Sequence, residues 1–404
     1  MNKRIQRPLL MFLLLSLMGP ITGCWDLIEL NNTTLITGIA MEPGHNGKIK
    51  LTLETLNASE ATQKGGKGTS PSVVQSIEGS TTAEAVNQLN QSIDRTMLIS
   101  HVGIIVFDEK LARTGLSKYL DPLQRSRYIR EDVTILISHN TAASNILKVL
   151  YPRGEYSSLK IREQVRSYEK GWGGIAASQL FDLTQALLVD GREPMIGAVT
   201  LNGDPKRSED TESIKSLAPK ALVNLSGMAV FRGDKLLGFL TRDESRMVIM
   251  ARNELHGTTL SVPVEDQGKF AAIRLLRVRP KMQVTLDNGK PDIRLTVDGE
   301  GLIYSIEKKE HLGEVSGYLN LEKQASDYVQ QQLAGTIQSV QQKFGVDIFG
   351  FGEYMYRRHY KEYSLVADEW NELFARTPVK VEARITLLRS ELKTDQLKKE
   401  EIGP

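Results

Sequence analysis

Cysteine is almost absent from this sequence, whose 404 residues include a single one, Cys24. One thiol cannot form an internal disulfide bond, and it excludes metal and redox sites that are built on paired cysteines. The six histidines are scattered along the chain and do not occur at metal-ligand spacing. We therefore expect no metal ion and no cofactor apart from a covalent modification of Cys24, described below.

An excess of charge is also lacking, because 51 Lys and Arg residues are balanced by 49 Asp and Glu residues. Bulk electrostatics therefore gives no reason to expect a nucleic-acid partner. The sequence shows no nucleophile motif. Ser100 and His101 are adjacent, but neighbouring side chains of an extended chain point to opposite faces. We expect a locally hydrogen-bonded turn there, and no enzymatic activity.

The apolar run near the amino terminus, residues 9–18, is too short to cross a bilayer. A membrane-spanning helix needs about 20 apolar residues, and this run has roughly half that number. Basic residues precede it at Lys3, Arg4 and Arg7. A basic start followed by a short apolar run is typical of an export signal, so we predict a signal peptide over residues 1–23.

The residues before the cysteine, Ile21-Thr22-Gly23-Cys24, resemble a bacterial lipobox. In such a motif the thiol receives a diacylglyceryl group, the peptide is cut in front of the cysteine, and the new amino terminus is acylated. We predict cleavage between Gly23 and Cys24 and both modifications at Cys24. Two acyl chains hold a protein stably to a bilayer, whereas one chain does so only marginally. The alternative is an ordinary signal peptide followed by a free thiol.

Strand and helix patterns alternate along the mature chain, which predicts mixed sheets covered by helices. A charged stretch between Pro205 and Pro219 has few large apolar residues, which is typical of a boundary between domains. The predicted units are an N-terminal α+β region (24–201), a charged linker (202–220), a middle β-rich domain (221–300), a C-terminal α+β domain (301–392) and a polar tail (393–404).

Five segments resemble those of one known family, and they follow in that family's order along nearly the whole mature chain. They are Gly23-Cys24-Trp25-Asp26 with Glu29-Leu30, Gly38-Ile39-Ala40, Arg95 with Ser100-His101, the hairpin Gly227–Gly238, and Asp347–Glu353. Together they resemble the Ger(x)C family, the lipoprotein C subunits of nutrient germinant receptors in endospore-forming bacteria.

This resemblance implies an α+β fold of three domains, each a mixed or antiparallel β-sheet surrounded by α-helices. It implies membrane-embedded A and B subunits of a germinant receptor as partners. It places the protein at the outer face of the spore's inner membrane, anchored through Cys24. The implied role is assembly or signal coupling in the response to nutrients, with nutrient recognition belonging mainly to the B subunit.

A contact for such a partner is predicted near the carboxyl end. The glycines around Phe349 and Phe351 free the backbone, so these rings could form an apolar contact with Tyr356 and Arg357 as a polar and basic rim. The alternative is that one or both rings close a core between helices.

A different class of function is a lipid-tethered solute-binding protein that delivers a small molecule to a membrane transporter. Such a protein would need two similar, parallel α/β lobes around a cleft. The apolar runs on either side of Arg232-Gly233-Asp234-Lys235 instead predict an antiparallel hairpin. The sequence therefore favours the receptor-subunit hypothesis.

Overall fold

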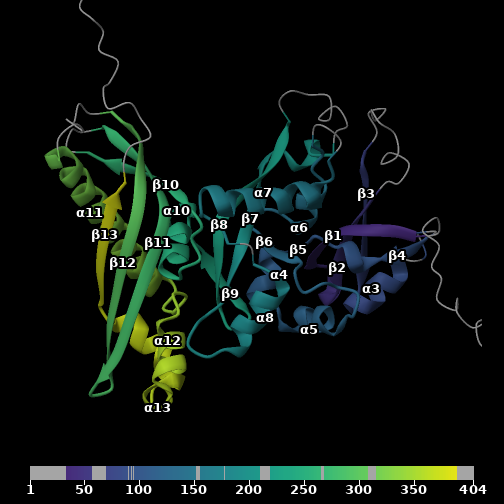
Figure 1. Ribbon diagram of the computed structural model, residues 1–404. Helices are drawn as coiled ribbons and strands as arrows, with labels where there is room; N and C mark the ends of the chain where they lie inside the picture. The colour runs from purple at the N-terminus through teal and green to yellow at the C-terminus, as the bar shows by residue number, and fades with distance from the viewer. Residues whose placement is uncertain are drawn as a thin grey trace, which may run out of the picture.

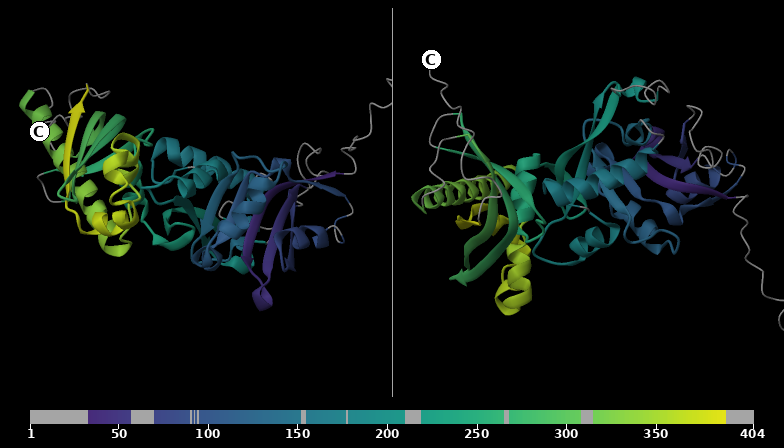
Figure 2. Two further views of the ribbon diagram at one scale, coloured as in Figure 1. Left: turned by 90° about the horizontal axis from the view of Figure 1, so that it is seen from below. Right: turned by 45° about the horizontal axis from the view of Figure 1, so that its top comes forward.

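The computed structural model describes residues 33–388, apart from 57–69, 90, 92, 94, 152–154, 177, 210–218, 265–267 and 308–314. Its strands form two sheets that lie towards opposite ends of an elongated molecule (Figure 1). Helices cover both sheets, as the two further views in Figure 2 show. The predicted α+β class with helix-covered sheets is confirmed, although the described strands form two sheets and not three.

The first sheet has nine strands in the order β3-β2-β1-β5-β6-β7-β8-β9, with β4 paired to β1. The central strands β1, β5, β6 and β7 are parallel, and the outer pairs are antiparallel. The strands are β1 (Thr33–Pro43), β2 (Ile49–Leu56), β3 (Ser72–Gly79), β4 (Thr96–Leu98), β5 (Ile104–Asp108), β6 (Thr134–Ser138), β7 (Met195–Gly203), β8 (Ala221–Arg232) and β9 (Lys235–Phe239). Every residue of β5 and β6 is buried, as expected for central parallel strands with helices on both faces.

The helices of the first sheet pack on its two faces. One face carries α3 (Thr82–Leu89), α4 (Glu109–Thr114), α5 (Ser117–Arg125) and α8 (Leu180–Leu188), and the other carries α6 (Ala143–Leu147), α7 (Ser157–Gly171) and α10 (Arg242–Ala251). The core beneath α6, α7 and α10 continues into the core of the second sheet. Val106 of the first sheet and Leu333 of α11 belong to one cluster of buried side chains. The two sheets therefore share a hydrophobic core.

The second sheet has the order β10-β11-β12-β13, in which only the β12–β13 pair is parallel. Its strands are β10 (Thr258–Pro263), β11 (Phe270–Asp287), β12 (Lys290–Ile306) and β13 (Val379–Leu387). Its helices are α11 (Val315–Lys343), α12 (Phe351–Arg358), α13 (Tyr360–Tyr363) and α14 (Trp370–Arg376). Helix α11 is amphipathic, and its apolar stripe, which includes Val329 and Leu333, is buried.

The predicted middle domain (221–300) is not a separate unit. The predicted linker 202–220 joins two neighbouring strands of one sheet, because Gly203 at the end of β7 pairs with Ala221 at the start of β8. The predicted boundary at 300/301 falls inside β12. Strands β8 and β9 thus complete the first sheet, while β10, β11 and β12 belong to the second. A charged stretch indicates a surface connection, but it does not reveal whether its flanking strands pair.

No helix among the described residues is long and apolar enough to cross a membrane.

The contact between α10 and α11 is partly polar. Glu244 accepts hydrogen bonds from Ser339 Oγ at 2.7 Å and Lys343 Nζ at 3.1 Å on α11. It also forms a capping box with Thr241 at the start of α10. Burial alone would raise the pKa of Glu244, but these hydrogen bonds outweigh it and lower the pKa to about 2.

The carboxylate of Glu244 should therefore stabilise the fold in a pH-dependent way. Its folded-state pKa of about 2 lies below the ordinary value of 4.5, so its contribution is complete above pH 4.5 and is lost as the pH falls towards 2. We expect Glu244→Gln to lower the free energy of unfolding by about 2 kcal/mol near neutral pH, the range for hydrogen bonds to a charged group. Urea unfolding of both chains across this pH window should show the difference shrinking with acid. A difference that stays constant would contradict this assignment.

Candidate functional site

A buried carboxylate, Asp347, organises the junction between the two sheets. Its Oδ1 accepts hydrogen bonds from the backbone N–H groups of Phe349 and Gly350, both at 2.9 Å. Its Oδ2 accepts from Gly352 N at 2.8 Å and from Trp370 Nε1 at 2.9 Å. A carboxylate placed before a helix in this way satisfies amide groups that the helix itself leaves unpaired. Asp347 therefore fixes the start of α12 and attaches α14 to it.

Asp347 is fully buried, and two opposing effects act on its charge. Burial raises the pKa of the Asp347 carboxyl, while the four donated hydrogen bonds oppose that rise. A buried charge is tolerated only where such donors replace water. The backbone conformation of residues 347–352 is therefore closely defined, because all four donors must stay within hydrogen-bonding distance of the Asp347 carboxylate.

Two glycines allow the backbones of the two halves of the chain to meet at this point. Glu353 N donates to Gly191 O at 2.9 Å, and Glu193 N donates to Asp347 O at 2.8 Å. A Cβ atom added to Gly191 would lie 2.5 Å from Glu353 N, and one added to Gly352 would lie 2.7 Å from Gly191 O. Any larger side chain at either position would force the two backbones apart. We call residues 191–193 and 347–353 the junction.

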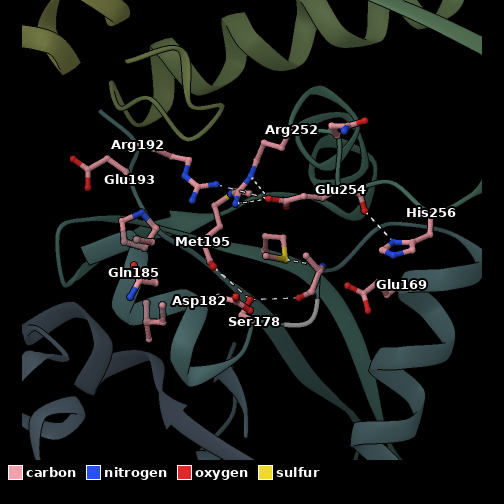
Figure 3. Close-up of a pocket in the computed structure, with 16 residues that line it drawn as sticks. Glu169, Ser178, Asp182, Gln185, Arg192, Glu193, Met195, Arg252, Glu254 and His256 are labelled. Atoms are coloured by element: carbon pink, nitrogen blue, oxygen red, sulfur yellow. Dashed lines mark hydrogen bonds and ion pairs between the residues drawn. The ribbon is translucent and has the colours of Figure 1, made fainter. Parts of the chain in front are cut away.

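Charged side chains surround the junction, as Figure 3 shows for its cavity side. Arg192 Nε lies 2.8 Å from Glu353 Oε2, and its Nη1 lies 3.8 Å from Glu254 Oε1. Arg252 Nη2 lies 2.7 Å from the same Glu254 oxygen (Figure 3). Burial, followed by the nearby positive charge of Arg252, lowers the pKa of Arg192. Glu254 pairs with both Arg192 and Arg252, and Glu353 pairs with Arg192, so the carboxylates hold the two arginines close together.

A cavity of ≈ 460 Å³ opens next to these charges. It lies between α8, the turn before β7 and the segment that follows α10, and its lining includes Ser178, Met195, Met228 and His256 (Figure 3). Ser178 Oγ is engaged with the backbone, since it donates to Met195 O and accepts from Gly197 N. Within the part of the chain that the structure describes, no cluster of three or more His, Cys, Asp or Glu residues could hold a metal ion. The cavity has polar residues in its lining and is large enough for a small molecule. Its two arginines, Arg192 and Arg252, already pair with carboxylates.

The prediction that Phe349 and Phe351 form a contact with a partner is wrong. Phe349 and Phe351 are 1% and 0% exposed. Their ring centroids lie 5.6 Å apart, and each ring packs on Phe374 at about 6 Å. Asp347 turns the segment inwards, so both rings close a core between helices, which is the alternative stated above.

The predicted rim residues lie on the surface. Tyr356 is 36% exposed and its ring packs edge-on against Tyr360 and Tyr363. The side chain of Arg357 is 68% exposed and pairs with Glu353. The predicted lipidation and cleavage residues, Gly23 and Cys24, lie outside the described residues.

Ser100 and His101 form the expected local turn. Both lie in the short 3-10 helix η4 (Ile99–His101) and not in an extended chain, so their side chains do not point to opposite faces: Ser100 Oγ is 3.1 Å from His101 Nδ1. The residues of the junction cavity were not found from the sequence. The role of Asp347 could have been read from the sequence. An Asp side chain often accepts hydrogen bonds from backbone N–H groups two or three residues later, which forms a capping turn. Arg192 and Glu254 carry no such signal, since they meet only through the tertiary fold.

Fold and junction together define an α+β protein of two helix-covered sheets that share a core and are joined by backbone hydrogen bonds at the junction. The same fold is found in the crystal structure of the GerBC protein, which superposes with a TM-score of 0.57 at 16% identity and covers 90% of this chain and 100% of the other.

Comparisons of sequence identify the family. Residues 226–391 match the model described as spore germination B3/GerAC like, C-terminal, and residues 26–201 match that of the spore germination protein N-terminal domain. Spore germination protein KC of Bacillus subtilis (strain 168) is 26% identical over 98% of both chains. Spore germination protein B3 of the same organism is 22% identical over 93% of this chain and 95% of its own. The chain belongs to the Ger(x)C family of spore germination proteins, as the sequence motifs predict.

The glycine contact at the junction can be tested with a matched pair of substitutions. Gly352→Ala should lower the free energy of unfolding by about 1–3 kcal/mol, because its Cβ would overlap Trp370 Nε1 and Gly191 O. Gly335→Ala is the control, since that glycine is exposed on α11 with open space around it. Alanine there should raise helix stability by up to about 1 kcal/mol. Chemical denaturation of both variants measures the effects, and equal stabilities would show that the junction tolerates a side chain.

Proposed function

We propose that this protein is the lipid-anchored C subunit of a nutrient germinant receptor. In this proposal it is held at the outer face of the spore's inner membrane through Cys24 and takes part in assembly or signal coupling with membrane-embedded A and B subunits. The observation that carries the proposal is the match of both family models, which together extend over most of the chain. The lipobox-like sequence before Cys24 supports the anchoring.

The fold suits a coupling role because the two sheets cannot move as independent bodies without cost. Separating them would break the shared core and the hydrogen bonds that cross the junction, from Glu193 N to Asp347 O and from Glu353 N to Gly191 O. Leaving such buried backbone groups without partners costs free energy. A contact made at one end of such a body can therefore be transmitted to the other end as a rigid displacement.

We also propose that the protein is not an enzyme. The charged groups beside the cavity pair with one another, as Arg252 does with Glu254. Ser178, which also lines the cavity, is hydrogen-bonded to the backbone. A nucleophile needs a free base within hydrogen-bonding reach, and neither arrangement supplies one.

The solute-binding alternative is less well supported. Two similar parallel lobes are not what the strands form, because the first sheet is mixed and nine-stranded whereas the second is four-stranded and mainly antiparallel. Calorimetry of the mature chain with germinants would separate the two hypotheses. Tight stoichiometric binding would favour solute delivery, and the cavity beside Arg192 would then be its first candidate site.

Lipid anchoring can be tested directly at Cys24. Mass spectrometry of protein from native spores should find Cys24 as the first residue, with a diacylglyceryl group and an N-acyl chain. Cys24→Ala should remove the acyl chains and release much of the protein from washed membranes, because two acyl chains supply most of the anchoring energy. Gln331→Ala, exposed on α11, is the control and should stay with the membrane. An unmodified amino terminus upstream of Cys24 would disprove the anchoring.

The surface around Tyr356 and Arg357 remains a proposed contact for a partner subunit. Affinity capture of solubilised spore membranes with Tyr356→Ala should recover about tenfold less of the A and B subunits, since aromatic anchors in interfaces contribute well over 1 kcal/mol. Tyr304→Ala is the matched control, because Tyr304 is an exposed tyrosine on β12. Equal recovery with both variants would exclude this surface.

A further inference from the structure

A second hollow, of ≈ 620 Å³, lies at the edge of the first sheet where the parallel strands β5 and β6 begin. Its lining includes η4 residues before β5, residues 127–130 and Asp132 before β6, and two side chains of α7. Four of the lining residues are arginines, Arg127, Arg130, Arg162 and Arg166, and Asp132 is the only carboxylate among the described residues that line it. A hollow of this kind attracts an anion.

Three of these arginines pair with carboxylates of the protein itself. Arg130 forms a two-point pair with Asp132 at 2.8 Å. Glu163, at the outer side of α7, lies 3.6 Å from Arg162 Nε and 3.4 Å from Arg166 Nη1. Among the described residues, Arg130, Arg162 and Arg166 thus share two carboxylates. The Nε atom of Arg162 is also buried without a hydrogen-bond acceptor, which is costly unless a ligand or water supplies one.

The hollow lies close to the point where the chain arrives from Cys24. Thr33, the first described residue, pairs with Thr96 on β4, and η4 with His101 follows β4 directly. Thr33 is nine positions after Cys24, and an extended chain of that length spans at most about 30 Å. Strands β1 and β4 lie at the end of the molecule opposite the second sheet (Figures 1 and 2). An acyl chain on Cys24 would therefore hold this end near the bilayer.

An aromatic side chain stands beside the arginines at the same edge. Tyr128 is 53% exposed, and the Arg127 guanidinium lies 4.8 Å from the centre of its ring. Exposed tyrosine next to basic residues is typical of protein surfaces at the level of lipid headgroups. Arginine pairs with phosphate oxygens through two parallel hydrogen bonds, so it suits a phosphate headgroup particularly well.

We propose that the hollow lined by Arg127, Arg130, Arg162 and Arg166 binds the phosphate of an anionic phospholipid in the membrane to which Cys24 tethers the chain. This inference rests on the proposed lipid anchoring for its placement. It assigns a second membrane contact, which orients the first sheet towards the bilayer.

The test uses the mature chain with Cys24→Ala, so that no acyl chain contributes to binding. This chain should sediment with vesicles of phosphatidylglycerol and phosphatidylcholine in equal parts, and not with phosphatidylcholine alone. Each arginine near an anionic surface contributes about fivefold to binding, so R162Q/R166Q should weaken the binding about thirtyfold. R274Q/R294Q, which removes two exposed arginines from the second sheet, is the control with the same change of charge.

Each outcome decides the matter. Equal weakening by the two double variants, or equal binding to both kinds of vesicle, would overturn the proposal. Saturable binding of inorganic phosphate that R162Q/R166Q abolishes, with vesicle binding unchanged, would assign the hollow to a soluble anion and would also overturn it. Circular dichroism checks that the variants fold, and the single variant R166Q, whose side chain is 54% exposed, should still show the fivefold loss. Since Cys24 is absent from every chain tested, failure of lipid anchoring would not affect the result.

Discussion

The need to solvate one buried carboxylate underlies much of this architecture. Asp347 is fully buried, so its charge is compatible with folding only if donors surround it, and these come from the turn before α12, from α12 itself and from Trp370 of α14. This requirement fixes the start of α12, the position of Trp370 and, through Asp347 O, the approach of Glu193. The glycines at 191 and 352 follow from the same arrangement, because only they allow the two backbones to come so close.

Local features of the fold could be predicted from the sequence. The hairpin of β1 and β2, the buried strand β5 and the amphipathic helix α11 each have a periodicity that depends only on nearby residues. The turn at Asn288 and Gly289 is of the same kind, since both residues have positive φ as a two-residue hairpin requires. The α+β class and the family also followed from local motifs.

Features that depend on distant partners could not be predicted. The sequence predicts a separate domain for the hairpin of β8 and β9, because its apolar pattern is the same whether it joins the first sheet or the second. The burial of Phe351 was left open for a similar reason: an aromatic ring between glycines suits a surface contact and a core equally well. Arg192, Glu254 and Glu353 come from three separate parts of the chain, and only the folded structure brings their charges together.

The positions of Gly191 and Gly352 in different halves of the sequence have a consequence for biosynthesis. A chain made from its amino end has completed the strands of the first sheet long before α12 exists, and the shared core stays open on one side until then. Contacts between such distant residues form late and slowly during folding. Nascent molecules must therefore pass through a stage in which apolar surface is uncovered, and exposed surface of this kind makes a folding chain prone to aggregation.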